Sequence, residues 1–218
     1  MADRSDVSVR RVVDEADRAH VLAVLGATYL AEKRWISNPE SQFPQGDIAK
    51  DHIAWFVAAA EGEPVGVVRI LYDPPIAAYA GYGFTSLDPS IRIDDFIDRA
   101  GIAEVGRFAV VPHCRRRFMI AAALMRAATI DSLKRRVTHL ITDVFEDDPH
   151  SPLGFHTRVV GFRAVATHDV GELNSASRRI TLVLDVNAAR EELSRRNNWF
   201  YRYIMSALPR ALHAQLAA

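Results

Sequence analysis

The stretch AEVGRFAVVPHCRRRFMIAAALM, residues 103–125, decides the fold of this 218-residue chain. Residues 103–111 are mostly apolar, which predicts a buried strand, and Pro112 ends it because proline has no backbone N–H to donate. From about Phe118 to Arg136, apolar residues recur at helical spacing and predict an amphipathic helix. A strand, a short turn and a helix therefore follow one another directly.

The turn between this strand and this helix is basic, with Arg115, Arg116 and Arg117 in a row. The first N–H groups of a helix have no intrahelical acceptor, and the helix dipole adds positive potential there. The turn therefore predicts a site for a phosphate or pyrophosphate. A solvated basic loop that only caps the helix would give the same spacing, and both interpretations stay open at this point.

Apolar runs separated by turn residues predict further elements on both sides of the stretch. Strands are expected at residues 7–13, 53–60, 64–72, 138–145, 162–170 and 178–186, and helices at about 14–34, around 93–99, just before Gly161, and from Asn187 to the end with a break near Pro209. This order predicts an α/β domain with a mixed, mostly antiparallel sheet flanked by helices. In this interpretation residues 1–186 form a single domain, and residues 187–218 form a helical extension that packs on the domain or on a partner subunit.

Composition excludes several classes of protein. Lys plus Arg and Asp plus Glu number 27 each, so the formal net charge of zero argues against a general nucleic-acid binder. The one cysteine, Cys114, forms no intrachain disulfide, and the N-terminus has no signal-peptide pattern. No apolar run is long enough to span a bilayer. We expect a soluble cytoplasmic protein, and no His, Cys, Asp or Glu spacing suggests a metal site.

Several of these motifs resemble the GNAT acyltransferases. Val110, Pro112 and Arg115 match the Val-x-Pro-x-x-Arg turn that binds the acyl-CoA pyrophosphate in that superfamily. Gly161-Phe162 resembles its later helix-to-strand junction, and the strand PVGVVRIL, residues 64–71, also fits. The resemblance covers roughly residues 8–186 and implies a GNAT-type fold, a phosphopantetheine thioester as donor and a small-molecule amine as acceptor.

A narrower resemblance concerns two branches of this superfamily. Residues 104–110, EVGRFAV, look like the Glu-x-Ser-Arg-Phe-x-Val strand of acyl-homoserine-lactone synthases, the autoinducer synthases, and are also similar to long-chain N-acyl amino acid synthases. Residues 65–71 resemble the Gly-x-x-Arg-Leu strand that these branches share, and Trp35 is compatible with their substrate-gating N-terminal part. The resemblance implies an acyl carrier protein, or sometimes acyl-CoA, as donor. It also implies donor contacts from Phe108, Val110, Arg115, Arg116, Arg117 and Phe118.

Four positions depart from the family pattern. Phe118 and Ile120 stand where the common GNAT loop has glycines, and a side chain there would crowd a CoA diphosphate. A carrier-protein donor has one phosphate only, which favours that branch. Gly106 replaces the serine of the lactone-synthase strand, and Thr157 replaces a tyrosine that often serves as the general acid.

The reaction needs a group that removes the proton of the amine and a group that protonates the leaving thiolate. Glu104 lies in an apolar strand, where burial raises a carboxyl pKa and suits a general base, although a structural pairing with Arg69 or Arg107 would explain it as well. His156 and Thr157 are the candidate proton donors. Cys114 beside three arginines is a weaker candidate for a nucleophile.

Aromatic and basic side chains supply the remaining candidates. Trp35, Tyr82 and Phe84, with Tyr79, lie in two irregular segments and would wall an apolar acyl pocket, with Arg69 and Arg107 as further substrate-binding residues. Tyr and Trp mixed with Arg in residues 195–210 fit packing on the domain, a homodimer interface or contact with a membrane surface.

The leading hypothesis is an N-acyltransferase that moves a medium- or long-chain acyl group to an amino acid or a related amine. Two alternatives stay open. One is an ordinary acetyl-CoA-dependent GNAT N-acetyltransferase, and the other is a catalytically degenerate GNAT domain that only binds acyl ligands.

Overall fold

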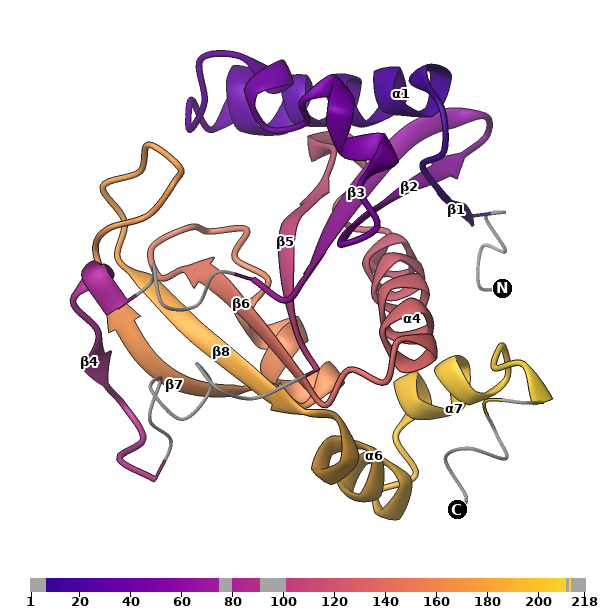
Figure 1. Ribbon diagram of the computed structural model, residues 1–218, viewed down its shortest axis with the longest axis vertical. Helices are drawn as coiled ribbons and strands as arrows, with labels where there is room; N and C mark the ends of the chain where they lie inside the picture. Colours follow the sequence, from indigo (N-terminus) through magenta and orange to yellow (C-terminus); the bar gives the residue numbers. More distant parts are fainter. Residues whose placement is uncertain (1–6, 75–79, 91–100, 211, 213–218) are drawn as a thin grey trace. The chain divides into compact units, whose positions relative to one another are not determined.

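The computed structural model describes residues 7–74, 80–90, 101–210 and 212 (Figure 1). The helix expected around residues 93–99 and the predicted pocket residue Tyr79 lie outside these ranges. The strand order in the sheet is β1-β2-β3-β5-β6-β8-β7-β4. Of the strand pairs described below, only β5 and β6 run parallel, so the predicted α/β fold with a mixed, mostly antiparallel sheet is confirmed.

The chain forms two compact units. Unit 1 comprises Met1–Leu71 and Val105–Thr129, and unit 2 comprises Tyr72–Glu104 and Ile130–Ala218. The chain passes from one unit to the other inside three elements: β3 (Glu63–Tyr72), β5 (Ile102–Val110) and α4 (Phe118–Lys134).

Unit 1 begins with β1 (Val7–Arg11), which pairs antiparallel with β2 (Ile53–Ala60), and β2 pairs antiparallel with β3. The helix α1 (Glu15–Leu25) starts where expected, because the Asp14 carboxylate accepts a 2.8 Å hydrogen bond from the Asp17 N–H. The expectation of one continuous α-helix to about residue 34 is wrong, because the α-helix ends at Leu25. After Leu25 the backbone widens into a π-helical segment, η1 (Gly26–Glu32), and two 3₁₀ turns follow, η2 (Pro39–Ser41) and η3 (Gln45–Ala49).

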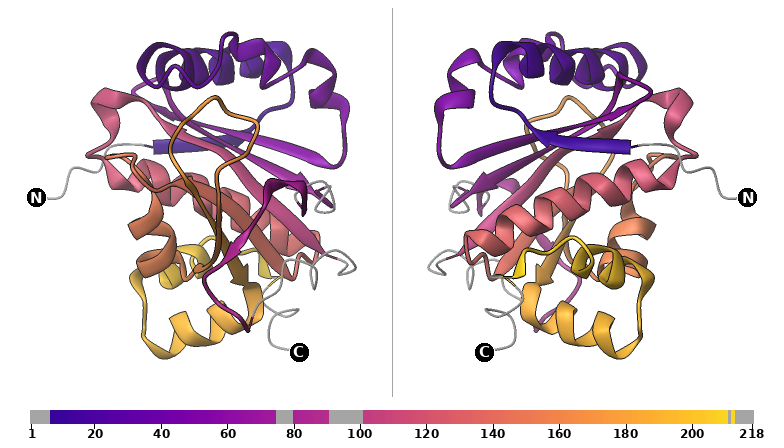
Figure 2. Two further views of the ribbon diagram at one scale, coloured as in Figure 1. Left: turned by 90° about the vertical axis from the view of Figure 1, so that its left-hand side faces the viewer. Right: turned by 90° about the vertical axis from the view of Figure 1, so that its right-hand side faces the viewer.

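Helices cover both faces of the unit 1 strands (Figure 2). On the α1 face, Phe43 stacks on Trp55 of β2 with ring centroids 4.6 Å apart, and Arg18 of α1 donates two hydrogen bonds to the Phe43 carbonyl. On the opposite face, Ile120 and Leu124 of α4 are fully buried. The Phe43 contacts tie β2 to α1, and α4 packs on the other face of the sheet against Gly66 of β3.

Gly66 of β3 permits the close approach of α4. A Cβ atom at this position would lie 3.0 Å from the Ala109 carbonyl oxygen, 3.0 Å from Leu124 Cδ1 and 3.1 Å from Ile120 Cγ2. We expect Gly66→Ala to lower the free energy of unfolding by about 1–3 kcal/mol, because backbone and helix must both move. Chemical denaturation measures this change. Gly46→Ala is the control, since a Cβ there meets nothing within 4 Å and should leave stability unchanged.

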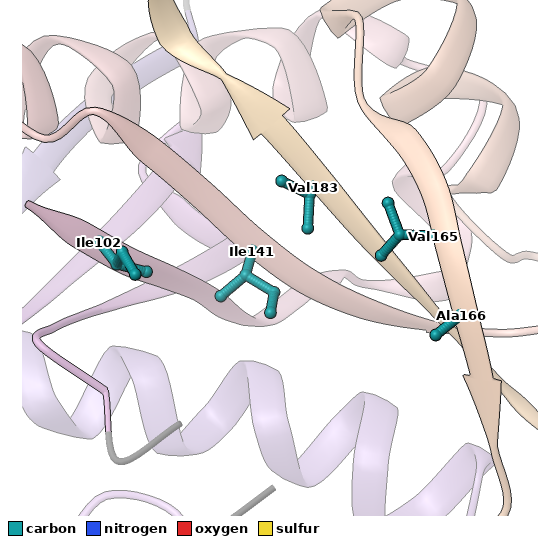
Figure 3. Close-up of a cluster of buried hydrophobic side chains, with 5 residues drawn as sticks. All are labelled: Ile102, Ile141, Val165, Ala166 and Val183. Atoms are coloured by element: carbon teal, nitrogen blue, oxygen red, sulfur yellow. The ribbon is translucent and has the colours of Figure 1, made fainter. Parts of the chain in front are cut away.

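Unit 2 contains the remaining strands. The antiparallel pairs are β6 with β8, β8 with β7 and β7 with β4, at β4 (Thr85–Ser86), β6 (His139–Phe145), β7 (Arg163–His168) and β8 (Arg179–Asp185). One face carries a cluster of buried apolar side chains, onto which Phe84 packs; the cluster consists of Ile102, Ile141, Val165, Ala166 and Val183 (Figure 3). A 3₁₀ turn, η4 (Ala80–Tyr82), precedes β4.

The helices of unit 2 are short. The helix expected before Gly161 is α5 (Leu153–Phe155) continued by a π-helical turn, η6 (His156–Val160), and Gly161 ends it with a φ of +100°. The expected long helix from Asn187 is two helices instead, α6 (Val186–Arg195) and α7 (Trp199–Met205). They separate because Asn197 adopts a φ of +50° and the Asn198 side chain accepts hydrogen bonds from the Phe200 and Tyr201 N–H groups, which starts a new helix.

Candidate active site

The strand β5 carries the motif that the sequence singled out. Its parallel pairing with β6 joins Ile102–Glu104 to His139–Ile141, and β5 itself continues beyond Glu104 to Val110. Arg107 has a φ of +52°, which is a left-handed conformation that an arginine rarely adopts. On a regular strand Glu104 and Arg107, three residues apart, would face opposite sides of the sheet. The left-handed conformation of Arg107 means that this rule does not apply here.

The predicted strand–turn–helix arrangement is present in unit 1. The Val111 N–H donates to the Val65 carbonyl of β3, and a 3₁₀ turn, η5 (Pro112–Cys114), leads to α4. The Arg117 carbonyl accepts from the Ile120 N–H, so this amide is not available to an anion. Cys114 is buried, which argues against the nucleophilic role considered above.

The three arginines of the turn have different environments. Arg115 forms a bidentate ion pair with Glu32 of η1, in which Nη1 donates to Oε1 at 2.5 Å and Nη2 donates to Oε2. Arg117 lies 3.5 Å from the Glu61 carboxylate, and Arg116 is exposed. The donors of Arg115 that were expected to bind a phosphate therefore bind a carboxylate in this structure.

The two residues that replace the family's glycines differ in their exposure to solvent. Phe118 is 54% exposed at the start of α4, whereas Ile120 is buried and points at Gly66 of β3. Only Phe118 is therefore placed to crowd a donor at this turn, and the argument from Ile120 is wrong. Phe108 and Val110 of β5 are both partly exposed.

The remaining predicted residues of unit 1 are Arg107, Arg69 and Trp35. Arg107 donates from Nε to Gln42 Oε1 at 2.7 Å, which ties β5 to the irregular 35–50 segment. Arg69 lies opposite Trp55 in the β2–β3 register. Trp35 makes an edge contact with Tyr29 and lies under the Lys33 ammonium, 5.6 Å from its ring centroid.

Tyr82 and Phe84 lie together in unit 2, with ring centroids 6.3 Å apart. Burial raises the pKa of Tyr82, and the negative charges of Glu172, Asp143 and Glu104 raise it further. The structure therefore places the predicted base Glu104 and the predicted pocket residue Tyr82 in one electrostatic environment. Asp143 belongs to the same environment, and the sequence signalled it only as a charge in an otherwise apolar strand.

The structure does not favour the two predicted proton donors. The side chain of His156 is completely buried between Phe155 and Phe162, and burial lowers its pKa to about 4, so the ring is neutral at pH 7. A neutral imidazole is a poor acid for a thiolate. The Thr157 hydroxyl donates to the Leu153 carbonyl at 2.8 Å within its own helical turn. The His156 ring packs against Phe162 of the Gly161-Phe162 junction instead.

The buried His156 gives a prediction for pH-dependent stability. Because its folded pKa of about 4 lies below the ordinary value of 6.5, the unfolded chain binds an extra proton between these pH values. The free energy of unfolding should fall by up to about 3 kcal/mol from this group as the pH drops from 6.5 to 4. Urea titrations of the wild type and His156→Gln at several pH values measure the difference. Equal pH dependence in both proteins would contradict the prediction.

Among the residues that the structure describes, no group of three His, Cys, Asp or Glu side chains could hold a metal ion. Likewise, the helices in the described part of the chain include none that is long and apolar enough to cross a bilayer.

Comparisons with known proteins agree with this geometry. Solved structures with similar folds include FeeM, an N-acyl amino acid synthase from uncultured soil microbes, with a TM-score of 0.62 at 17% identity over 91% of this chain and 98% of that one. The ribosomal-protein-alanine N-acetyltransferase from Brucella melitensis gives a TM-score of 0.56 at 18% identity, over 82% of this chain and 99% of that one. An aminoglycoside 6'-acetyltransferase type Ii gives 0.56 at 13% identity, over 82% and 96%.

The search of curated proteins by sequence found no match. The family model for the acetyltransferase (GNAT) family matches residues 23–162, which include β2, β3, the β5–α4 turn and the η6 junction. Together the strand–turn–helix geometry and this match show that the chain belongs to the acetyltransferase (GNAT) family and is an acyltransferase.

Proposed function

We propose that this acyltransferase moves a medium- or long-chain acyl group from an acyl carrier protein, or from acyl-CoA, to the amine of an amino acid or a related small molecule. The observation that carries the proposal is Phe118, an exposed aromatic side chain at the first residue of α4, where a CoA diphosphate would need open backbone. A donor with a single phosphate on its pantetheine arm needs less room. The fold shared with an N-acyl amino acid synthase supports an amino acid as the acceptor.

Glu104 acts as the general base in this proposal. It takes the proton of the acceptor's nitrogen, directly or through a water, and the nitrogen lone pair attacks the thioester carbonyl. The tetrahedral intermediate then collapses, the C–S bond breaks, and the thiolate leaves and takes up a proton. Glu104 fits this role because of its position and its surroundings. It pairs with Ile141 at the end of the parallel β5–β6 ladder, and it shares the electrostatic environment of Tyr82.

In unit 1 the donor's phosphate competes with Glu32 for Arg115. We expect Glu32→Gln to tighten binding of 4'-phosphopantetheine by up to about fivefold, because it removes one surface ion pair. Arg115→Gln should weaken binding by about tenfold or more. Isothermal titration calorimetry measures the affinity of each variant at two salt concentrations. Both differences in affinity should be smaller at the higher salt concentration, because salt screens charges at the surface.

The matched control is a second bidentate pair. Arg178 donates to both oxygens of Glu146 at 2.7 and 3.0 Å, far along the chain from the turn. Glu146→Gln frees this arginine as Glu32→Gln frees Arg115, and it should leave phosphopantetheine binding unchanged. If both variants bind alike, the Arg115 turn is not the phosphate site.

A donor comparison tests the proposed function. The purified protein is incubated with a mixture of the twenty amino acids and one of three donors: dodecanoyl acyl carrier protein, dodecanoyl-CoA or acetyl-CoA. Products are identified by mass spectrometry. We expect N-dodecanoyl amino acids, formed fastest from the carrier protein. Transfer from acetyl-CoA alone would support the ordinary N-acetyltransferase instead, and no product from any donor would support an acyl-binding domain without turnover.

A further inference from the structure

The basic turn before α4 has carboxylates beside its arginines. In unit 1, two carboxylates from separate elements converge on this turn: Glu32 from the end of η1, and Glu61 from the turn between β2 and β3. Glu32 accepts hydrogen bonds from both terminal nitrogens of Arg115, and Glu61 Oε1 lies 3.5 Å from Arg117 Nη1. A negative charge therefore offsets two of the three arginine charges before any ligand binds.

Arg117 supplies positive charge to the turn but few hydrogen-bond donors. Its Nε and Nη2 atoms are buried and have no hydrogen-bond partner among the described residues, while Nη1 faces Glu61. The side chain of Glu61 is 83% exposed, against 28% for that of Arg117. An anion that approaches Arg117 from solvent therefore meets the Glu61 carboxylate as well.

The backbone of the β2–β3 turn does not explain a glutamate at position 61. Ala60 pairs with Glu63, so the turn has two residues, and both are left-handed, with φ of +56° at Glu61 and +86° at Gly62. Turns of this kind favour asparagine or aspartate followed by glycine, because a larger side chain is strained in the left-handed region. Glu61 therefore occupies a position that an asparagine would fit better, and its charge beside Arg117 is what an asparagine would lack.

Glu32 lies at the turn because of an equally uncommon backbone. It is the last residue of the π-helical segment η1, in which the Lys33 N–H donates to the Thr28 carbonyl five residues earlier, at 2.9 Å. The wider π-helical winding directs Glu32 to a different side of the helix axis from the one that a continued α-helix would give. Lys33 Nζ lies 3.9 Å from Glu32 Oε1, so a second cation helps to hold this carboxylate in place.

The two carboxylates act differently on the two kinds of donor. The arm of a carrier protein is a phosphodiester with one negative charge, whereas the diphosphate of CoA has two. Coulomb energies scale with the product of the charges, so three arginines alone would favour the diphosphate. Each carboxylate opposes the diphosphate about twice as strongly as it opposes the phosphodiester, and it therefore reduces the advantage of CoA.

We propose that Glu32 and Glu61 select the donor: they lower the positive potential of the turn, so that it binds the singly charged arm of a carrier protein without favouring the diphosphate of CoA. This inference rests on the proposed N-acyltransferase function and deepens it, because it assigns the choice of donor to charge as well as to the space that Phe118 occupies. Both carboxylates act through Arg115 and Arg117, so their effect is on donor binding.

Three probes that share the pantetheine arm and differ in charge test the proposal. They are pantetheine, which is neutral, its 4'-methyl phosphodiester, with one negative charge, and dephospho-CoA, with a diphosphate. Calorimetry at low salt gives the affinity of the wild type and of Glu32→Gln for each probe. We expect the variant to bind pantetheine as the wild type does, the phosphodiester about threefold more tightly and dephospho-CoA about tenfold more tightly.

Glu61→Asn is the second variant, and it does not depend on the fold tolerating a poorer residue. Asparagine suits the left-handed position, so the melting temperature should stay the same or rise. Binding should tighten by about twofold for the phosphodiester and about fourfold for dephospho-CoA. Glu146→Gln is the control, because it breaks a bidentate pair with Arg178 in unit 2, and it should change the affinity for none of the probes.

The dependence on charge decides the outcome. Equal gains for the two charged probes, a gain for pantetheine, or no binding of either charged probe to the wild type would overturn the inference. Acyl transfer from the carrier protein together with equal gains would refute donor selection by charge and leave the proposed function standing. Gains that grow with the charge of the probe, without acyl transfer from any donor, would refute the function and leave the selection of anions by Glu32 and Glu61 standing.

Discussion

Replacing Glu104 by glutamine should lower the rate of acyl transfer by about 10²–10⁴-fold, the usual loss when a general base is removed. Glutamine keeps the size of the side chain and its hydrogen-bonding atoms, so the fold and the binding of the thioester should be preserved. The melting temperature should therefore change little while single-turnover acyl transfer nearly stops.

The two measurements must be made on the same sample, because the alternative role of Glu104 predicts the opposite pattern. If Glu104 only pairs with an arginine, Glu104→Gln would lower stability by about 3–5 kcal/mol. A mutant that melts early but transfers acyl groups at the wild-type rate would remove Glu104 from the mechanism. Glu146→Gln serves as the control, because Glu146 lies in the same unit in an exposed ion pair and should leave the rate unchanged.

Phe200→Ala should produce the largest loss of stability. Phe200 of α7 is completely buried, and its ring meets that of Phe155 edge-on at 5.9 Å, while Asn198 donates to the Val159 carbonyl. Removing a fully buried phenyl ring costs about 3–5 kcal/mol, because it leaves a cavity. Urea denaturation measures this loss directly.

The matched control is Phe118→Ala, which removes the same ring from an exposed position and should change stability by about 0.5 kcal/mol or less. The comparison also bears on the proposed extension at residues 187–218. We propose that it packs on the protein's own domain, since its buried ring contacts the α5–η6 segment of unit 2. Equal effects of the two alanine variants would contradict this and would favour packing on a second subunit.

The strands and the main helix could be predicted because their signals are local. The strand that ends at Pro112 and the helix that begins at Phe118 depend on periodicity and on one proline, and both are where the sequence indicated. The errors concern backbone irregularities. The positive φ values of Arg107 and Asn197 are departures at single residues, and the π-helical segment after Leu25 is a departure over the seven residues Gly26–Glu32. Packing selects both kinds, and the spacing of apolar residues does not predict either.

The candidate site could be predicted in part for the same reason. A charge inside an apolar strand is visible in the sequence, which is how Glu104 was found. The burial of His156 depends on Phe155 and Phe162 around it, and an isolated histidine gives no sign of this. The pairing of Arg115 with Glu32, 83 residues away, could not be inferred from the sequence either.

The most direct test of the central claim is mass spectrometry of lipid extracts from cells that express the wild-type protein or Glu104→Gln at equal levels. We predict new N-acyl amino acids with medium or long acyl chains in the wild-type extract, and their near absence from the mutant extract. Identical extracts from wild-type cells and cells without the protein, or N-acetylated amines as the only new products, would contradict the proposed long-chain N-acyltransferase.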